Sequence, residues 1–74
     1  MSKLPANLRW QDVANALRKI GYYPTKFKSG THLLLRNDEG KTVTVIMKSP
    51  VKRGTLEAII DRVGMTREEF LKLL

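Results

Sequence analysis

The sequence has no cysteine, no long apolar run and few acidic residues, and each shortage narrows what the chain can be. Without cysteine, neither a disulfide nor a thiolate metal site can support the fold. No apolar stretch approaches the roughly 20 residues that a membrane-spanning helix needs, and residues 1–5 lack the apolar segment of a secretion signal. We therefore expect a cytoplasmic protein with no membrane partner.

The charge of the chain is strongly basic. Lysine and arginine number 14 against 7 aspartate and glutamate, which leaves a net charge of +7 on 74 residues. Such an excess favours an anionic partner, such as a nucleic acid or an acidic protein, although surplus lysines also serve solubility alone. The hydrophobic fraction of 42% is ordinary for a globular protein. At this length we expect one domain over residues 1–74, with a small core.

The first part of the chain predicts a lead-in followed by a helix. Residues 1–7 show no regular pattern. Apolar residues then recur three or four positions apart, which predicts an amphipathic helix over residues 10–20. Asn7 is a candidate N-cap, and Gly21 suits the left-handed conformation that ends many helices.

The middle of the chain alternates with a period of two and is rich in β-branched and aromatic residues. It predicts three strands, over residues 22–28, 31–36 and 41–47. Ser29-Gly30 and residues 37–40 are expected to form two tight turns, so that the strands make an antiparallel meander. Because proline cannot donate to a strand ladder, Pro24 suggests that the first strand lies at an edge.

The last part predicts a basic connector and two helices. The connector covers residues 48–54, and helical spacing follows as far as Gly64. Thr66 and Glu69 have the spacing of a capping box, which predicts a short third helix. The whole order is an α+β fold of the α-β-β-β-α type, with a three-stranded antiparallel sheet and the helices on one face. Double-stranded-RNA-binding domains share this layout.

The only histidine of the chain, His32, is the candidate catalytic residue. A histidine side chain has an ordinary pKa of about 6.5, which suits proton transfer near neutral pH. Alternation puts Leu33 and Leu35 on one strand face and His32, Leu34 and Arg36 on the other, open face. RNA cleavage needs little more than a proton shuttle and cations, because the ribose 2′-hydroxyl lies beside the scissile phosphate. A lone histidine in a strand is, however, more often a surface or packing residue than a catalyst.

The cations of two strands and the connector form the candidate RNA-binding set. These are Lys26, Lys28, Arg36, Lys48, Lys52 and Arg53. The other helical cations, Arg62 among them, are interpreted as the polar faces and ends of helices. Among the aromatic residues, Trp10 and at least one of Tyr23 and Phe27 are expected in the core.

The acidic pairs have structural explanations. Asp38 and Glu39 fall in a predicted turn, and Glu68 and Glu69 fall at a predicted helix cap. With one histidine and no cysteine, few metal ligands remain. We expect neither a metal nor another cofactor.

Four short segments in this order resemble the HicA toxin family, small messenger-RNA-cleaving partners of HicB antitoxins that are also described as YcfA-like proteins. They are residues 16–22, Gly30-Thr31-His32, residues 52–56 and residues 63–71. The resemblance implies a fold like that of double-stranded-RNA-binding domains and metal-independent cleavage of mRNA. It also implies a catalytic histidine at His32 and a HicB-like antitoxin that covers the active surface.

The sequence departs from the family pattern at two places. Thr31 stands where a serine usually precedes the histidine, and residues 46–50 lack the second histidine that many members carry. Either Lys48 supplies a cation at that position, or the activity is lower than in other members. Leu34, on the face of His32, is a candidate contact for an acidic, partly apolar partner or else a packing residue.

Two other functions remain open from the sequence. One is a non-catalytic RNA-binding module of the same fold, for which the same charge would suffice. The other is a protein-interaction domain for an acidic partner. A homo-oligomer is neither indicated nor excluded.

Overall fold

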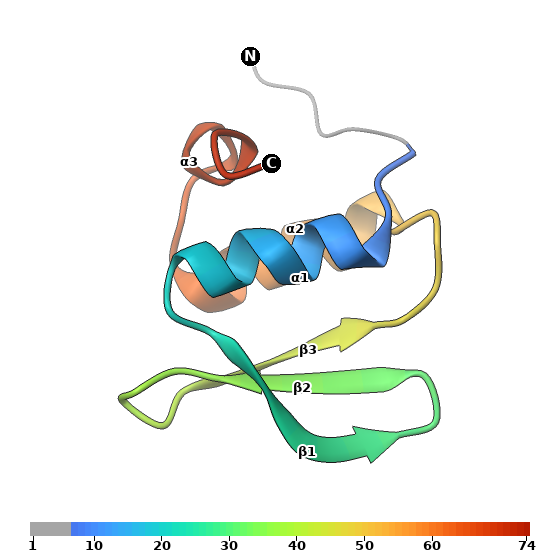
Figure 1. The fold of residues 1–74 in the computed structure, drawn as a ribbon. Helices are drawn as coiled ribbons and strands as arrows, with labels where there is room; N and C mark the ends of the chain where they lie inside the picture. The colour runs from blue at the N-terminus through green and yellow to red at the C-terminus, as the bar shows by residue number, and fades with distance from the viewer. Residues whose placement is uncertain (1–6) are drawn as a thin grey trace.

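The computed structural model describes residues 7–74, without the side chains of residues 26–29. Its elements follow the predicted order (Figure 1): α1 (Trp10–Lys19), β1 (Tyr23–Ser29), β2 (His32–Arg36), β3 (Thr42–Ile46), α2 (Arg53–Val63) and α3 (Arg67–Leu71). Of the predicted lead-in, only Asn7 falls within the described residues. The connector is shorter than expected, because Arg53 and Gly54 already belong to α2.

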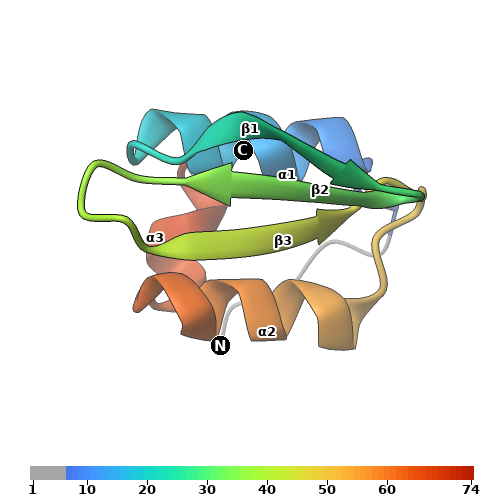
Figure 2. The ribbon, with the colours of Figure 1, turned by 90° about the horizontal axis from the view of Figure 1, so that it is seen from below.

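The three strands form one antiparallel sheet in the order β1-β2-β3. Helices α1 and α2 cover one face, and α3 lies beyond them on the same side (Figure 1). Viewed from below, no described helix crosses in front of the strands, and α2 runs alongside β3 (Figure 2). The α+β fold with helices on one face is therefore confirmed, as is the edge position of β1.

The β1–β2 hairpin turns one residue later than predicted. Ser29 pairs with His32, so the loop is Gly30-Thr31 and not Ser29-Gly30. Gly30 has a φ of 57° and no other residue of the described loop has a positive φ, which fits a type II′ turn with glycine at its first central position. The strand alternation is unaffected by this shift, because His32 keeps its place at the start of β2.

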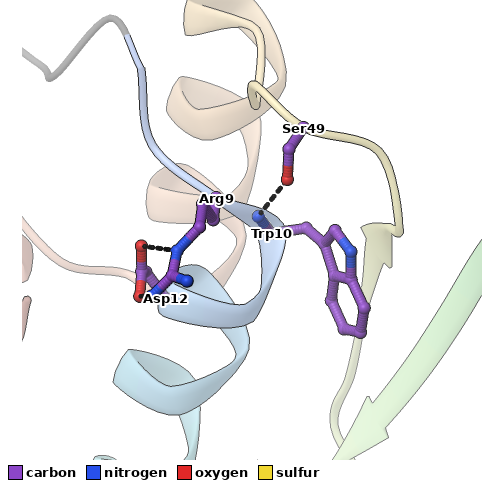
Figure 3. Close-up of polar contacts among 4 residues, drawn as sticks. All are labelled: Arg9, Trp10, Asp12 and Ser49. Atoms are coloured by element: carbon purple, nitrogen blue, oxygen red, sulfur yellow. Dashed lines mark hydrogen bonds and ion pairs between the residues drawn. The ribbon is translucent and has the colours of Figure 1, made fainter.

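Helix α1 begins differently from the prediction. Its N-cap is Arg9, not Asn7, and the Arg9 side chain makes no capping bond. Instead, the backbone N–H of Trp10 donates to the hydroxyl of Ser49 at 3.2 Å (Figure 3). A side chain 39 positions away thus satisfies one of the unpaired N–H groups that begin every helix.

Arg9 and Asp12 form an ion pair across the first turn of α1 (Figure 3). The Nε and Nη2 atoms of Arg9 donate to the two carboxylate oxygens of Asp12 at 3.2 and 3.1 Å. This side-chain hydrogen bonding holds the pKa of the Asp12 carboxyl below its ordinary value. The charge of Asp12 also lies at the positive end of the helix dipole.

The end of α1 decides which tyrosine is buried. Gly21 has a φ of 95°, as predicted, and the N–H of Tyr22 donates to the carbonyl of Leu17 at 3.0 Å. An apolar contact at the second position after such a helix end is common, and Tyr22 is only 4% exposed. Tyr23 is 53% exposed, so it does not belong to the core. Trp10 is half-buried against the core, and the side chain of Phe27 lies outside the described part.

The core lies between the sheet and the helices. Leu33 and Leu35 of β2 and Val43 and Val45 of β3 are buried, which confirms the predicted alternation. No described polar or charged side chain is buried. Residues on the other side of these strands therefore project away from the helices and form the open face.

Helix α3 is fixed by a capping box and one buried ring. The hydroxyl of Thr66 accepts from the N–H of Glu69 at 3.1 Å, and the Glu69 carboxylate accepts from the N–H of Thr66 at 2.9 Å. The hydrogen bond from the backbone N–H of Thr66 is the main cause that lowers the pKa of the Glu69 carboxyl. Phe70 is completely buried. The predicted capping box is thus confirmed.

Candidate functional site

His32 is the first residue of β2 and is exposed on the open face. Its neighbours across the sheet are Ser29 on β1 and Ile46 on β3. Just beyond this position, the N–H of Met47 donates to the carbonyl of Thr31 at 2.6 Å and extends the ladder. The backbone that holds His32 is therefore paired on both sides, while its side chain remains accessible.

An open groove runs from His32 between β3 and α2. It has a volume of about 540 Å³, within the usual range of ligand sites. One wall comes from β3 and the other from α2, where the buried Ile59 lies among exposed and half-buried positions. The lining residues are His32, Thr42, Val43, Thr44, Ile46, Thr55, Ala58, Ile59 and Arg62.

A second, smaller hollow of about 260 Å³ adjoins the groove at Ile46, the residue that pairs with His32. It shares Ile46 and Thr55 with the first and adds Lys48 and Lys52 to the lining. Both lysines are exposed, and neither forms an ion pair within the described part of the chain. Their charges are therefore available to an anion at the His32 end of the groove.

The connector that holds these lysines is tied to the start of α1 at two points. The Ser49 hydroxyl accepts from Trp10, and the N–H of Val51 donates to the carbonyl of Leu8 at 2.8 Å. Val51 itself is buried. The backbone of Lys48 and Lys52 is thus fixed relative to the sheet by their neighbours.

The structure gathers only part of the predicted basic set around His32. Arg53 follows Lys52 at the start of α2 and is exposed. Arg36 shares the face of His32 but lies at the other end of β2, about 13 Å away at the usual rise of a strand. Its Nη2 atom lies over Gly40, 3.6 Å from the position that a Cβ atom on this glycine would occupy. The Arg36 guanidinium therefore lies by the turn between β2 and β3 and not beside His32.

The predictions for Lys26 and Lys28 fall on side chains outside the described part. The backbone of Lys28 pairs with Leu33, next to the pair between Ser29 and His32. Their roles in RNA binding stay predictions.

Of the groove lining, the sequence analysis predicted only His32 as a site residue, and Thr55 and Arg62 of α2 are among those that it missed. The Nε–H of Arg62 donates to the backbone carbonyl of Thr42 at 3.0 Å, across the edge of the sheet. Arg62 follows Thr55 by seven positions, which is about two turns, so both lie on one side of α2. Helical spacing could have grouped them, but only the packing of α2 beside β3 shows which side faces the groove.

The acidic residues have the structural roles that were predicted. Asn37 accepts from the N–H groups of Glu39 and Lys41 and closes the turn between β2 and β3.

Within residues 7–74, as far as they are described, no three histidine, aspartate or glutamate side chains form a group that would hold a metal ion. In the same part of the chain, none of the helices has the length and apolar character needed to cross a bilayer.

The family model of the HicA toxin of bacterial toxin–antitoxin systems matches residues 10–65. The chain belongs to the HicA toxin family. The matched region covers α1, the whole sheet and α2, and so includes His32 and both parts of the groove. No curated protein matches the chain. This HicA-family protein is therefore a toxin of the toxin–antitoxin type, with the expected sheet and helices.

Proposed function

We propose that this HicA-family toxin is a ribonuclease that cleaves messenger RNA and thereby inhibits translation and growth. The observation that best supports it is the position of His32, exposed in a groove that shares Ile46, its partner on β3, with the hollow lined by Lys48 and Lys52. A proton-transfer group and free cations thus line two adjoining hollows of one accessible surface. The family membership supports the same function.

The proposed reaction is attack of the ribose 2′-oxygen on the neighbouring phosphorus. The bond from phosphorus to the 5′-oxygen breaks, which leaves a 2′,3′-cyclic phosphate and a 5′-hydroxyl. His32 acts as general base towards the 2′-hydroxyl or as general acid towards the leaving oxygen. Lys48 and Lys52 offset the negative charge that builds up on the phosphate oxygens. The nucleophile belongs to the RNA itself, so the proposed reaction needs no metal.

One histidine can serve only one of the two proton transfers. Lys48 follows β3 in the segment where many family members have a second histidine. In this protein we assign it a charge-stabilising role, and the second proton is exchanged with water.

The test is incubation of the purified protein with labelled single-stranded RNA in the presence of a chelator. We expect shorter products with 5′-hydroxyl ends from the wild-type protein. Intact RNA that is shifted on a gel, with an affinity that falls steeply as salt rises, would instead show the non-catalytic RNA-binding module. Absence of any salt-sensitive binding would favour a protein-interaction domain.

The proposed partner is a HicB-like antitoxin that covers the open face of the sheet. This face presents the exposed Tyr23, the half-buried Leu34 and the cation Arg36. An acidic protein with apolar contacts would complement it. Leu34→Glu should therefore weaken the complex with a small acidic protein encoded beside this one. Leu74→Glu, at an exposed position outside the sheet, is the control and should bind as wild type.

A further inference from the structure

We propose that the groove between β3 and α2 is a nucleotide-binding subsite for single-stranded RNA, with Arg62 binding a phosphate at the end away from His32. The inference rests on the proposed ribonuclease function and adds a second phosphate position to it. It also assigns a role to the apolar wall between the two ends.

The lining of the groove combines an apolar surface with hydroxyl groups. Ile46 and Ala58 provide apolar surface from the two walls, and Thr42, Thr44 and Thr55 provide hydroxyls. A base can lie against the apolar part, and each hydroxyl can donate to or accept from a base edge or a ribose. Such a mixture, in a volume of about 540 Å³, is typical of sites for small polar ligands.

Arg62 is held in place before any ligand binds. Its Nε–H donates to the carbonyl of Thr42, and the side chain makes no other polar contact within the described part of the chain. The two terminal nitrogens therefore remain for an anion at the edge of the groove. A guanidinium that is fixed by one bond binds phosphate with a smaller loss of side-chain freedom than a mobile lysine.

The backbone positions that mark the two ends of the groove lie well apart. Ile46 pairs with His32, and Thr42, the contact of Arg62, lies four residues back along β3. At the usual strand rise this separation is about 13 Å. Arg62 and His32 would therefore meet different phosphates of one strand. A base that enters the groove between them must be unpaired, so the ligand is single-stranded RNA.

Two variants separate the phosphate contact from the base contact. Arg62→Gln removes the charge at the far end, and Ala58→Leu fills the groove without a change of charge. Arg18→Gln is the control, because it removes the same charge from an exposed position on α1. All three are made in the His32→Ala protein, so that the RNA stays intact. Circular dichroism checks that each variant is folded.

The readout is the affinity for a short single-stranded RNA, measured by fluorescence anisotropy at several salt concentrations. Arg62→Gln should lower the slope of log affinity against log salt by about 0.7, the value for one phosphate contact. Ala58→Leu should weaken binding by about fivefold or more, as for one lost base contact, with the slope unchanged. Arg18→Gln should keep the slope of its parent.

Two other outcomes would contradict the proposal, one for the subsite alone and one for the ribonuclease function as well. If the parent binds RNA but Arg62→Gln and Ala58→Leu match Arg18→Gln in affinity and slope, the groove is not a subsite, while the proposed ribonuclease function stands. If wild-type protein neither binds nor cleaves RNA, the proposed function fails and the subsite fails with it.

Discussion

Neutralising Lys48 and Lys52 should weaken RNA binding by removing local charge beside His32. Both side chains line the hollow that adjoins the groove of His32 at Ile46, both are exposed, and neither has an ionic partner in the described part. The double variant Lys48→Gln/Lys52→Gln therefore loses two phosphate contacts without leaving an unpaired carboxylate. We expect it to fold as wild type, since surface substitutions of this kind usually change stability by less than about 0.5 kcal/mol.

The size of the effect follows from counterion release. Each contact with a single-stranded phosphate contributes about 0.7 to the slope of log affinity against log salt, so two contribute about 1.4. When salt rises from about 50 to 200 mM, a slope contribution of about 1.4 corresponds to roughly a sevenfold loss of affinity. The double variant should lack this part of the salt dependence. Fluorescence anisotropy with a short RNA, in the His32→Ala background, measures both slopes.

The matched control is Arg18→Gln/Lys72→Gln, which removes the same charge from exposed positions on α1 and just after α3. We expect its salt slope to stay within about 0.3 of its parent, well below the value for one contact. Equal changes in the two double variants would refute the reasoning. Binding would then depend on net charge alone, and not on the position of Lys48 and Lys52.

Two further predictions concern α3. Phe70→Ala should lower the free energy of unfolding by about 3–5 kcal/mol, because the ring is completely buried and a helix of five residues is not stable alone. Urea denaturation measures this loss. The control Leu74→Ala should change the free energy of unfolding by less than about 0.5 kcal/mol. The pKa of Glu69 is lowered from 4.5, so its carboxylate stabilises the fold above that value and the contribution is lost as the pH falls through the lowered pKa. Glu69→Gln should therefore reduce the dependence of the urea midpoint on pH below about pH 5, and an unchanged pH dependence would contradict the assigned role of the capping box.

Local patterns predicted the fold and the face of His32. Alternation in β2 depends only on neighbouring residues, and the burial of Leu33 and Leu35 confirms it. The capping box of Thr66 and Glu69 is equally local and was also confirmed. At these positions, residue chemistry and spacing alone decide the conformation.

Predictions that depend on distant parts of the chain were less successful. The expected cap at Asn7 was wrong, because Ser49 reaches the start of α1 from the connector. Arg36 was correctly placed on the face of His32, but alternation gives the face and not the distance along the strand. Arg62 was assigned to a polar helix face, and only the packing of α2 beside β3 brings it to the groove.

The catalytic role of His32 is tested most directly by RNA cleavage with the His32→Ala protein in the presence of a chelator. The side chain is exposed, so we expect the variant to keep its circular dichroism spectrum and its urea midpoint. We expect wild-type protein to produce fragments with 2′,3′-cyclic phosphate ends, and the variant to bind the RNA without cleaving it. A folded His32→Ala protein that cleaves RNA at the wild-type rate would contradict the account.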